Sequence, residues 1–244
     1  MKIITIASQK GGTGKTTTAA ALAQAAAAAG KRPLAIDLDP QGNFTASLGA
    51  DPAAPGSYEL LSGANPAQSI LETEQGVFVI AASPDLATIR TKAGSARRLQ
   101  QALEPLKKSF DLCLIDTPPQ MGDLTYNALQ ASSGVIVPLE TDSNSLQGLF
   151  LLADIVRQMQ QSNPGLSITG VILTRYDNRP KINRFFRDAI AERGRELGAP
   201  LLGTIRAGVA IREAQALQQS LFDYAPHSKP AQDYKKLYHT IMEG

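Results

Sequence analysis

The chain has 244 residues, a net charge of +2, and 43% hydrophobic against 19% charged residues. A chain of this composition can bury a substantial core, which excludes an intrinsically disordered protein. Its single cysteine excludes a disulfide framework within the chain, and its two histidines leave little for a zinc site. No secretory leader is expected before the first strand-like run, and the longest apolar stretch, residues 19–29, is too weakly apolar to span a bilayer. The sequence therefore predicts a cytoplasmic protein.

Charge is spread unevenly along the chain. From Arg175 to the C-terminus there are 12 Lys and Arg residues against 8 Asp and Glu, whereas the first 174 residues carry 12 against 14. The net charge of +4 in the C-terminal third permits a surface that binds nucleic acid but does not establish one.

Strand-like and helical patterns alternate along the whole chain. Short apolar runs predict strands at residues 3–8, 33–37, 77–81, 112–116, 135–138, 168–174 and 201–205. Helical patterns cover residues 16–29, 95–108, 146–161, 183–197, 210–218 and 230–242. Gly30 is expected to end the first helix, and residues 50–76 are expected to form loops and short helices beside the sheet.

Apolar strands separated by helices are typical of a parallel sheet that is covered on both faces. No domain linker and no internal repeat interrupts this alternation. The sequence thus predicts a single doubly wound α/β domain over residues 1–244, with a mostly parallel sheet flanked by helices. No helix-turn-helix extension is expected before its first strand.

A glycine-rich loop follows the first predicted strand and opens the first helix, with Ser-Gln-Lys-Gly-Gly-Thr-Gly-Lys-Thr-Thr at residues 8–17. The glycines let the backbone N–H groups curl around an anion, and the helix N-terminus adds its dipole. Lys15 supplies a charge for the β- and γ-phosphates, and the Thr16 hydroxyl can ligate Mg²⁺. The pattern predicts a phosphate loop formed by Gly11, Gly12, Thr13, Gly14, Lys15, Thr16 and Thr17.

This loop departs from the general phosphate-loop pattern, because Gln9 stands where the first glycine is expected and Lys10 adds a second lysine. Lys10 has no evident role within the phosphate loop of one subunit. The motifs contain no candidate for an arginine finger, so transition-state charge must be met by two lysines and the metal. We therefore expect slow hydrolysis in the absence of a partner.

Two of the predicted strands end in acidic residues. Asp116 occupies the position of a carboxylate that holds Mg²⁺, directly or through water. Asp37 and Asp39 are expected to point to the same side of an extended segment, one near the metal and the other orienting the attacking water. Because the carboxyl ends of parallel strands converge on one crevice, these groups should meet the phosphate loop. The predicted metal ligands are Thr16, Asp37 and Asp116.

Together these motifs closely resemble those of the ParA/Soj partition ATPases, within the ParA/MinD superfamily of proteins with a deviant Walker A loop. Residues 10–17, 37–43 and 116–119 carry the resemblance, which extends to residues 174–179 and 224–229. It implies an ATP hydrolase with ATP and Mg²⁺ as cofactors and Lys10, Lys15 and Asp39 as catalytic residues. Lys10 would reach across a dimer to the partner's phosphates, and Arg175 and Arg206 would lie at the nucleotide.

The resemblance also implies a homodimer in the ATP state, non-specific binding to double-stranded DNA of the nucleoid, and a ParB-type partner that stimulates the ATPase. Residues 206–210 lack arginines at the two places where the family carries them, and the neighbouring Arg206 and Arg212 are expected to substitute. The candidates are Arg179, Arg184, Arg187, Arg206, Arg212 and Lys229. Next to Arg184 and Arg187, the side chains of Phe185, Phe186 and Ile190 are expected to join the core.

An ATPase that positions cargo on a membrane or a protein assembly, similar to MinD, is the alternative. It would need a terminal amphipathic helix, and the last predicted helix has apolar side chains at helical spacing but only a thin basic face. Packing on the domain, without stable membrane insertion, is therefore expected of Tyr234, Leu237, Tyr238, Ile241 and Met242. A metabolic P-loop ligase gives Lys10 no role, and a scaffold with an inactive site would not need Lys15, Thr16, Asp39 and Asp116.

Overall fold

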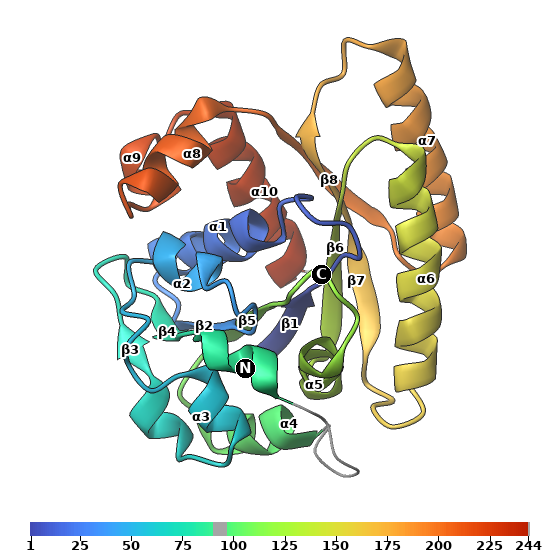
Figure 1. The fold of residues 1–244 in the computed structure, drawn as a ribbon. Coiled ribbons are helices and arrows are strands. Elements are labelled where there is room, and N and C mark those ends of the chain that lie inside the picture. The colour runs from blue at the N-terminus through green and yellow to red at the C-terminus, as the bar shows by residue number, and fades with distance from the viewer. Residues whose placement is uncertain (90–96, 244) are drawn as a thin grey trace.

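The computed structural model describes residues 1–89 and 97–243 (Figure 1). Its centre is one eight-stranded sheet in the order β3-β4-β2-β5-β1-β6-β7-β8, in which only β3 and β4 pair antiparallel. The strands are β1 (Lys2–Ile6), β2 (Pro33–Asp37), β3 (Leu71–Glu72), β4 (Phe78–Ile80), β5 (Leu112–Asp116), β6 (Gly134–Leu139), β7 (Ser167–Tyr176) and β8 (Leu201–Arg206). The predicted fold class, a doubly wound and mostly parallel α/β sheet, is confirmed.

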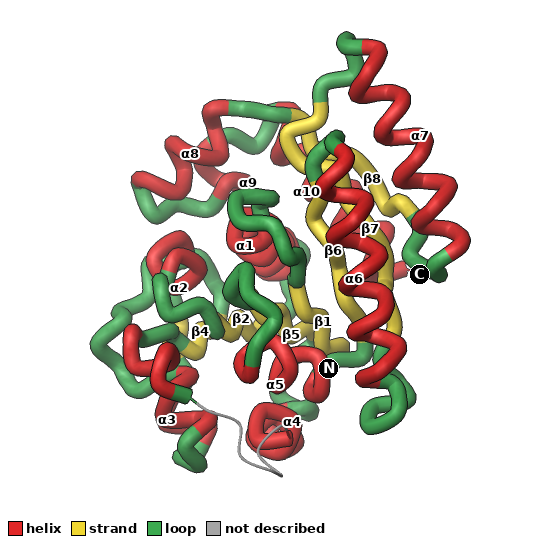
Figure 2. The backbone as a smooth tube through the Cα atoms, turned by 45° about the vertical axis from the view of Figure 1, so that its right-hand side comes forward, coloured by secondary structure: helices red, strands yellow, loops and turns green. Residues whose placement is uncertain are grey.

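Helices cover both faces of this sheet (Figures 1 and 2). One face carries α1 (Lys15–Ala28), α2 (Asn43–Ser47), α8 (Val209–Ala216), α9 (Leu221–Tyr224) and α10 (Lys229–Glu243). The other carries α3 (Ser57–Leu61), α4 (Arg98–Leu103), α5 (Asp123–Ala131), α6 (Ser143–Met159) and α7 (Lys181–Glu196). Short 3-10 turns add η1 (Pro66–Ser69), η2 (Pro84–Thr88) and η4 (Glu104–Leu106).

Successive side chains of the central strands point to opposite faces of the sheet. On β5, Leu112 and Leu114 pack under α1, whereas Cys113 and Ile115 pack against the layer that contains α4. This alternation is the period-two geometry of a strand, and both sets are apolar because both faces are covered. Cys113 is fully buried in this arrangement, as its place in a core strand predicts.

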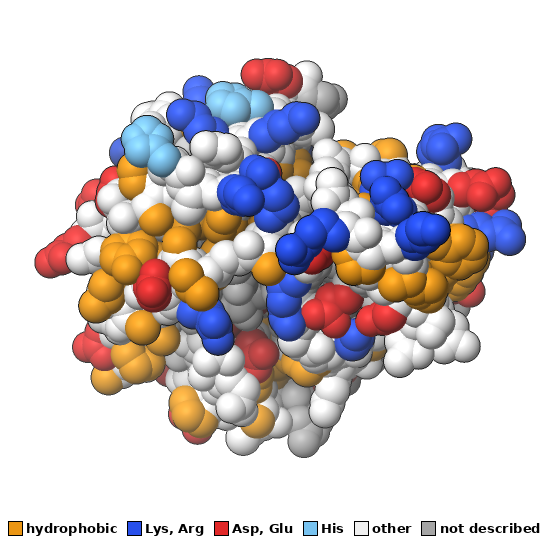
Figure 3. All heavy atoms as spheres, turned by 90° about the horizontal axis from the view of Figure 1, so that it is seen from above, with side chains coloured by type: hydrophobic (Ala, Val, Ile, Leu, Met, Phe, Trp, Pro, Cys, Tyr) orange, Lys and Arg blue, Asp and Glu red, His pale blue; other side chains and the backbone are white. Residues whose placement is uncertain are grey.

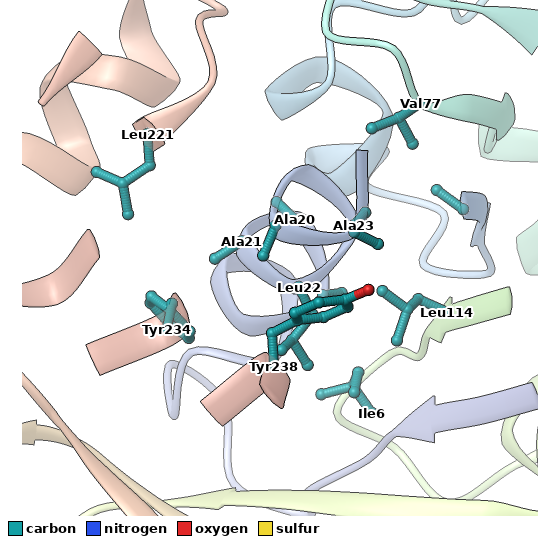
Figure 4. Close-up of a cluster of buried hydrophobic side chains, with 14 of the residues drawn as sticks. Ile6, Ala20, Ala21, Leu22, Ala23, Val77, Leu114, Leu221, Tyr234 and Tyr238 are labelled. Atoms are coloured by element: carbon teal, nitrogen blue, oxygen red, sulfur yellow. The ribbon is translucent and has the colours of Figure 1, made fainter. Parts of the chain in front are cut away.

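Helix α1 is rich in alanine because it is enclosed on nearly all sides. Figure 4 shows Ala20, Ala21 and Ala23 around the helix, with Tyr238 of α10 next to Leu22. Small side chains let the sheet, α2 and α10 approach the helix closely. The helix ends in a Schellman motif, because Gly30 adopts a left-handed φ of 73° and the Lys31 N–H donates to the Ala26 carbonyl at 3.0 Å. Gly30 therefore ends the helix as predicted.

All seven predicted strands are present, within a few residues of their expected ends. The prediction omitted the two-residue edge strand β3 and the helices α2, α5 and α9. The helix predicted at 95–108 is α4 followed by a 3-10 turn at Pro105, which cannot continue the α-helical hydrogen bonding; residues 95 and 96 lie outside the described part. Residues 50–76 do form short helices, a turn and an edge strand.

The expectation for the aromatic pair on α7 is wrong for one residue. Phe185 is 65% exposed, Phe186 is half-buried, and only Ile190 is fully buried. The first turns of α7 extend beyond the body of the sheet, where no layer covers them (Figures 1 and 2). By contrast, Tyr234, Leu237, Tyr238 and Ile241 of α10 are buried against α1 and the sheet, and Met242 packs at their edge. No helix in the described residues is long and apolar enough to cross a membrane.

The docking of α10 gives a first prediction. Replacing the buried Leu237 by alanine leaves a cavity between α10 and its neighbours, so the free energy of unfolding should fall by about 2–5 kcal/mol. Urea denaturation measures this loss. Lys236→Ala, on the exposed side of the same helical turn, should change the free energy by less than about 0.5 kcal/mol. Equal effects of the two substitutions would show that α10 is not packed as described.

Candidate functional site

The glycine-rich loop lies between β1 and α1, at the carboxyl edge of the sheet. Gly12 and Gly14 adopt left-handed φ angles of 76° and 88°, which L side chains rarely adopt. At Gly14 a Cβ atom would also come within 3.4 Å of the Thr174 side chain. Thr174, at the end of β7, fixes the loop from outside, because its hydroxyl donates to the Thr13 carbonyl at 2.7 Å.

The two lysines of the loop have different surroundings. Lys15 begins α1 and is buried, and this burial lowers the pKa of its ammonium group, while Asp116 and Asp39 act to raise it. The side chain of Lys10 is 37% exposed, and its Nζ donates at 2.7 Å to both Glu140 Oε2 and Asp142 Oδ2. Lys10 therefore has two carboxylate partners within its own subunit, which no sequence motif indicated. Both acids follow β6.

Asp37 and Asp116 stand opposite each other on the neighbouring strands β2 and β5, and both are fully buried. Burial raises the pKa of each carboxyl group, and nearby carboxylate charge raises both pKa values further. Thr16 Oγ1 donates to Asp116 Oδ2 at 2.6 Å, which joins the start of α1 to β5. Two of the three predicted metal ligands are therefore in direct contact.

Asp37 and Asp116 differ in how their oxygens are used. Asp37 Oδ2 accepts from the backbone N–H and the hydroxyl of Thr45, both at 2.8 Å, and Oδ1 accepts from the Asp39 N–H at 3.0 Å. Asp116 Oδ1 is buried and has no hydrogen-bond partner among the described residues. A cation reached directly or through water would satisfy this oxygen, so Thr16 and Asp116 fit Mg²⁺ well. Asp37 holds the following loop and contributes its charge.

Asp39 is less buried than Asp37. It lies two residues beyond the end of β2, is half-exposed, and accepts the Gln41 N–H in the turn that Gly42 closes. Its charge nevertheless acts on Lys15, which places it near the phosphate loop. A carboxylate that is close to the phosphates and accessible to solvent can orient a water molecule, so the role expected of Asp39 stays a prediction.

A cavity of about 660 Å³ adjoins the start of α1. Arg175, Arg206 and Arg212 line it, together with side chains of α1, α8 and α10 such as Thr17, Gln215 and Tyr234. Because the cavity is continuous with Gly14 of the loop, its position suits the base and sugar of a nucleotide whose phosphates lie on the loop. Arg206 is anchored at its edge by Asp233, with Nη2 and Oδ1 2.7 Å apart.

Arg175 has an unusual backbone conformation. Its φ is 51°, one of two positive values for non-glycine residues in the described chain, and the pairing of β7 with β8 is irregular there. The side chain turns back over the loop, donates to the Gly12 carbonyl and pairs with Glu140 Oε1 at 3.1 Å. Arg175 thus connects the cavity beside the start of α1 with the outer edge of the phosphate loop.

The predicted DNA-binding residues do not form one uniform group. Arg179 pairs with Asp177 and Arg187 with Asp188, at 2.6 and 2.7 Å. Arg184, Arg212 and Lys229 have no ion pair within residues 1–89 and 97–243. Figure 3 shows Lys and Arg side chains spread over the face that is seen from above, with acidic side chains among them. Arg212 also lines the cavity, so it can serve either surface.

Comparison with known proteins places this site among nucleotide-binding proteins. Residues 1–168 match the family model described as an AAA domain. The chain is 37% identical to the chromosome-partitioning ATPase Soj of Thermus thermophilus, over 98% of this chain and 94% of that protein. It is 35% identical to the chromosome partitioning protein ParA of Caulobacter vibrioides, over 99% and 94%.

Solved structures with a similar fold include two that contain ATP or an ATP analog. A cobyrinic acid a,c-diamide synthase from Mycobacterium smegmatis with bound ATP analog and magnesium has a TM-score of 0.83 at 32% identity, covering 100% of this chain and 95% of the other. The cell division ATPase MinD of Pyrococcus furiosus has a TM-score of 0.82 at 28% identity, covering 99% and 98%. A Cyanothece McdA–ATP complex reaches 0.86 at 26%, covering 100% and 95%.

The buried acidic pair predicts a pH dependence of stability. Since the folded state raises both pKa values above the ordinary 3.8, the stability contribution of these groups is complete below that pH and is lost as the pH rises through the raised values. Asp116→Asn removes one charge and should flatten this decline, gaining at least about 1 kcal/mol relative to the unmodified protein at pH 8. Urea denaturation without Mg²⁺ or nucleotide, at a series of pH values, measures it.

Asp85→Asn, at an exposed position, is the matched control and should leave the pH profile unchanged. In isothermal titration, Asp116→Asn should also weaken the Mg²⁺ dependence of nucleotide binding. A profile that is identical for the unmodified protein and Asp116→Asn would contradict the assignment of Asp116 as a buried, cation-seeking carboxylate.

Proposed function

Because this chain belongs to the ParA/Soj family of P-loop partition ATPases, we propose that it is a dimerisation switch driven by Mg²⁺ and ATP. In the ATP state two copies bind DNA without sequence preference, and hydrolysis releases them. The cargo is plasmid, chromosomal or mobile-element DNA, which a ParB-type protein marks. The whole chain acts as one domain, in the cytoplasm and on the nucleoid.

One observation carries the proposal of a dimer. The loop holds two lysines, of which Lys15 is buried at the start of α1 and Lys10 lies at the outer edge with 37% of its side chain exposed. Lys15 is placed to bind the phosphates of the nucleotide in its own subunit. Lys10, the exposed second cation on the same loop, is therefore suited to bind the phosphates of a nucleotide held by a second copy.

Each predicted site residue has a role in this proposal. The backbone of residues 11–17 and the Lys15 ammonium bind the phosphates, and Thr16 and Asp116 hold Mg²⁺ beside the charge of Asp37. Asp39 orients the attacking water, while Arg175 and Arg206 border the nucleotide. Turnover is slow because no arginine from a second protein is present, and a ParB-type partner accelerates it.

The alternative is an ATPase that positions cargo on a membrane or a protein assembly, as the MinD and McdA neighbours suggest. Membrane attachment through α10 is disfavoured, because its apolar side chains are buried in the core. A small-molecule synthase is disfavoured as well. The base and sugar of the nucleotide would occupy the cavity beside the loop, so this cavity does not indicate a second substrate. A synthase would also give Lys10 no role. A protein assembly as cargo is the form of the alternative that the structure accommodates.

Two lysine substitutions test whether Lys15 binds the nucleotide of its own subunit while Lys10 acts in dimerisation. Lys15→Ala removes a charged phosphate ligand and should weaken ATP binding roughly 10- to 100-fold. Lys10→Ala should leave ATP binding by the monomer within about threefold, while dimerisation and turnover are lost. Fluorescent nucleotide titration and light scattering measure these effects, with Asp39→Ala as a variant that should accumulate the dimer. An unmodified protein and an Asp39→Ala variant that both stay monomeric at saturating ATP would exclude the switch.

DNA binding should depend on nucleotide and on salt. With ATP, binding to unrelated duplexes should be equally tight, and with ADP much weaker, since dimerisation doubles the number of phosphates that are neutralised. If Arg184 of each copy neutralises one phosphate, Arg184→Ala removes two contacts per dimer and should make the slope of log affinity against log salt shallower by about two units. Arg193→Ala is the control on the same helix, because Arg193 pairs with Glu196 at 2.8 Å. Negligible binding in both nucleotide states would favour a protein assembly as cargo.

A further inference from the structure

Two carboxylates and two cations form one connected network at the outer edge of the phosphate loop. Glu140 lies at its centre, because Oε2 accepts from Lys10 at 2.7 Å and Oε1 pairs with Arg175 at 3.1 Å. Asp142 Oδ2 gives Lys10 a second carboxylate at the same distance of 2.7 Å. Arg175 closes the network by donating to the carbonyl of Gly12 within the loop itself. The four side chains come from three separate segments of the chain.

The backbone around this network is built to hold it in place. Asp142 caps α6, since its Oδ1 accepts the Ser145 N–H at 2.8 Å, so its carboxylate is fixed before it meets Lys10. The Glu140 N–H donates to the Ser145 hydroxyl at 3.2 Å. Arg175 reaches the loop from its left-handed backbone position at the irregular end of β7. Non-glycine residues in that conformation are strained and are retained where the surrounding structure imposes them.

Electrostatics work against release of Lys10 from this position. The hydrogen bonds to Asp142 and then Glu140 raise the pKa of Lys10 above its ordinary value. Partial burial acts to raise the pKa of Asp142, but the bonds from Lys10 and Ser145 lower it overall. Lys10 and Asp142 are thus both held in their charged forms. In this arrangement the Lys10 ammonium group pairs with carboxylates of its own subunit.

We propose that Glu140 and Asp142 are positioning residues that hold Lys10 and Arg175 against the phosphate loop of their own subunit, and that Lys10 must leave them before it can act on a second copy. Glu140 is the shared element, because Oε2 accepts from Lys10 while Oε1 pairs with Arg175. The second half of the inference rests on the proposed dimerisation, whereas the first half does not.

The first test needs neither nucleotide nor a dimer. In the double variant Glu140→Gln/Asp142→Asn the amides keep the shape of the side chains, and asparagine still caps α6. The Lys10 amine should then be acylated roughly 2- to 30-fold faster by an amine-reactive ester, the range for the loss of two partly exposed ion pairs. Peptide mass spectrometry reads Lys10 separately from Lys15. The control Asp154→Asn/Glu196→Gln removes two surface ion pairs elsewhere and should leave the rate unchanged.

The second test connects the network with dimerisation. The ATP concentration for half-maximal dimerisation should fall in the Glu140→Gln/Asp142→Asn variant by a similar factor, while ADP binding by the monomer stays the same within about twofold. An equal gain in ADP binding would overturn the proposal, because it would show a general effect of removing negative charge.

The two failures are distinguishable. If Lys10 is acylated equally fast in both double variants and the unmodified protein, the holding role is wrong, whatever the protein does with ATP. If acylation rises as expected but the unmodified protein never dimerises, the proposed function is wrong while Glu140 and Asp142 keep their role.

A single substitution tests the shared carboxylate by itself. Arg175→Ala leaves Glu140 to Lys10 alone, so the ion pair between them should strengthen and Lys10 should be acylated more slowly than in the unmodified protein. A rate that is unchanged or faster in this variant would contradict the sharing of Glu140 between the two cations.

Discussion

Two buried carboxylates on adjacent strands set the conditions for the rest of the site. Asp37 and Asp116 lie in register at the ends of β2 and β5, and neither is accessible to solvent. Their repulsion is compensated by Thr16, by the buried Lys15 and by the backbone N–H groups after β2. Oδ1 of Asp116 has no hydrogen-bond partner among the described residues. A bound Mg²⁺ would supply positive charge to this oxygen, and would thereby couple ligand binding to folding stability.

The surrounding fold keeps these groups in place. α1 begins at the phosphate loop and is enclosed by the sheet on one side and by α10 on another, with alanines permitting the close approach (Figure 4). The carboxyl ends of β1, β2, β5, β6 and β7 then deliver the loop, the acids and Thr174 to one edge of the sheet. The packed core therefore positions the buried charges of the site. At the outer edge of the site, ion pairs join Lys10, Glu140 and Arg175.

Local sequence patterns predicted the parts of this structure that depend on local chemistry. Apolar runs predicted the seven strands. Glycine spacing predicted the phosphate loop and the end of the first helix at Gly30. Acids at strand ends predicted that Asp116 would lie next to Thr16. Glu140 and Asp142 follow β6 in the same way, so the rule that selected Asp116 could have found them. The missed features depend on tertiary structure: the partners of Lys10, the backbone of Arg175, and the exposure of Phe185 beyond the edge of the sheet.

The difference in burial between Asp37 and Asp39 could not be predicted from strand alternation. β2 ends at Asp37, so Asp39 lies in the turn that Gly42 closes. The Asp39 side chain is half-exposed there, whereas Asp37 is fully buried. The same short segment thus carries a buried carboxylate that holds the loop and an accessible one that suits catalysis.

The proposed dimerisation switch requires that Lys10 of one copy acts on the nucleotide of another. Mixing Lys10→Ala with Lys15→Ala tests it most directly, because neither variant alone has a complete site. If Lys10 acts between copies, a mixed dimer combines the nucleotide held by the first variant with the Lys10 of the second, and ATP turnover returns on mixing. Turnover no higher than that of the separate variants, at concentrations where the unmodified protein dimerises, would contradict the account.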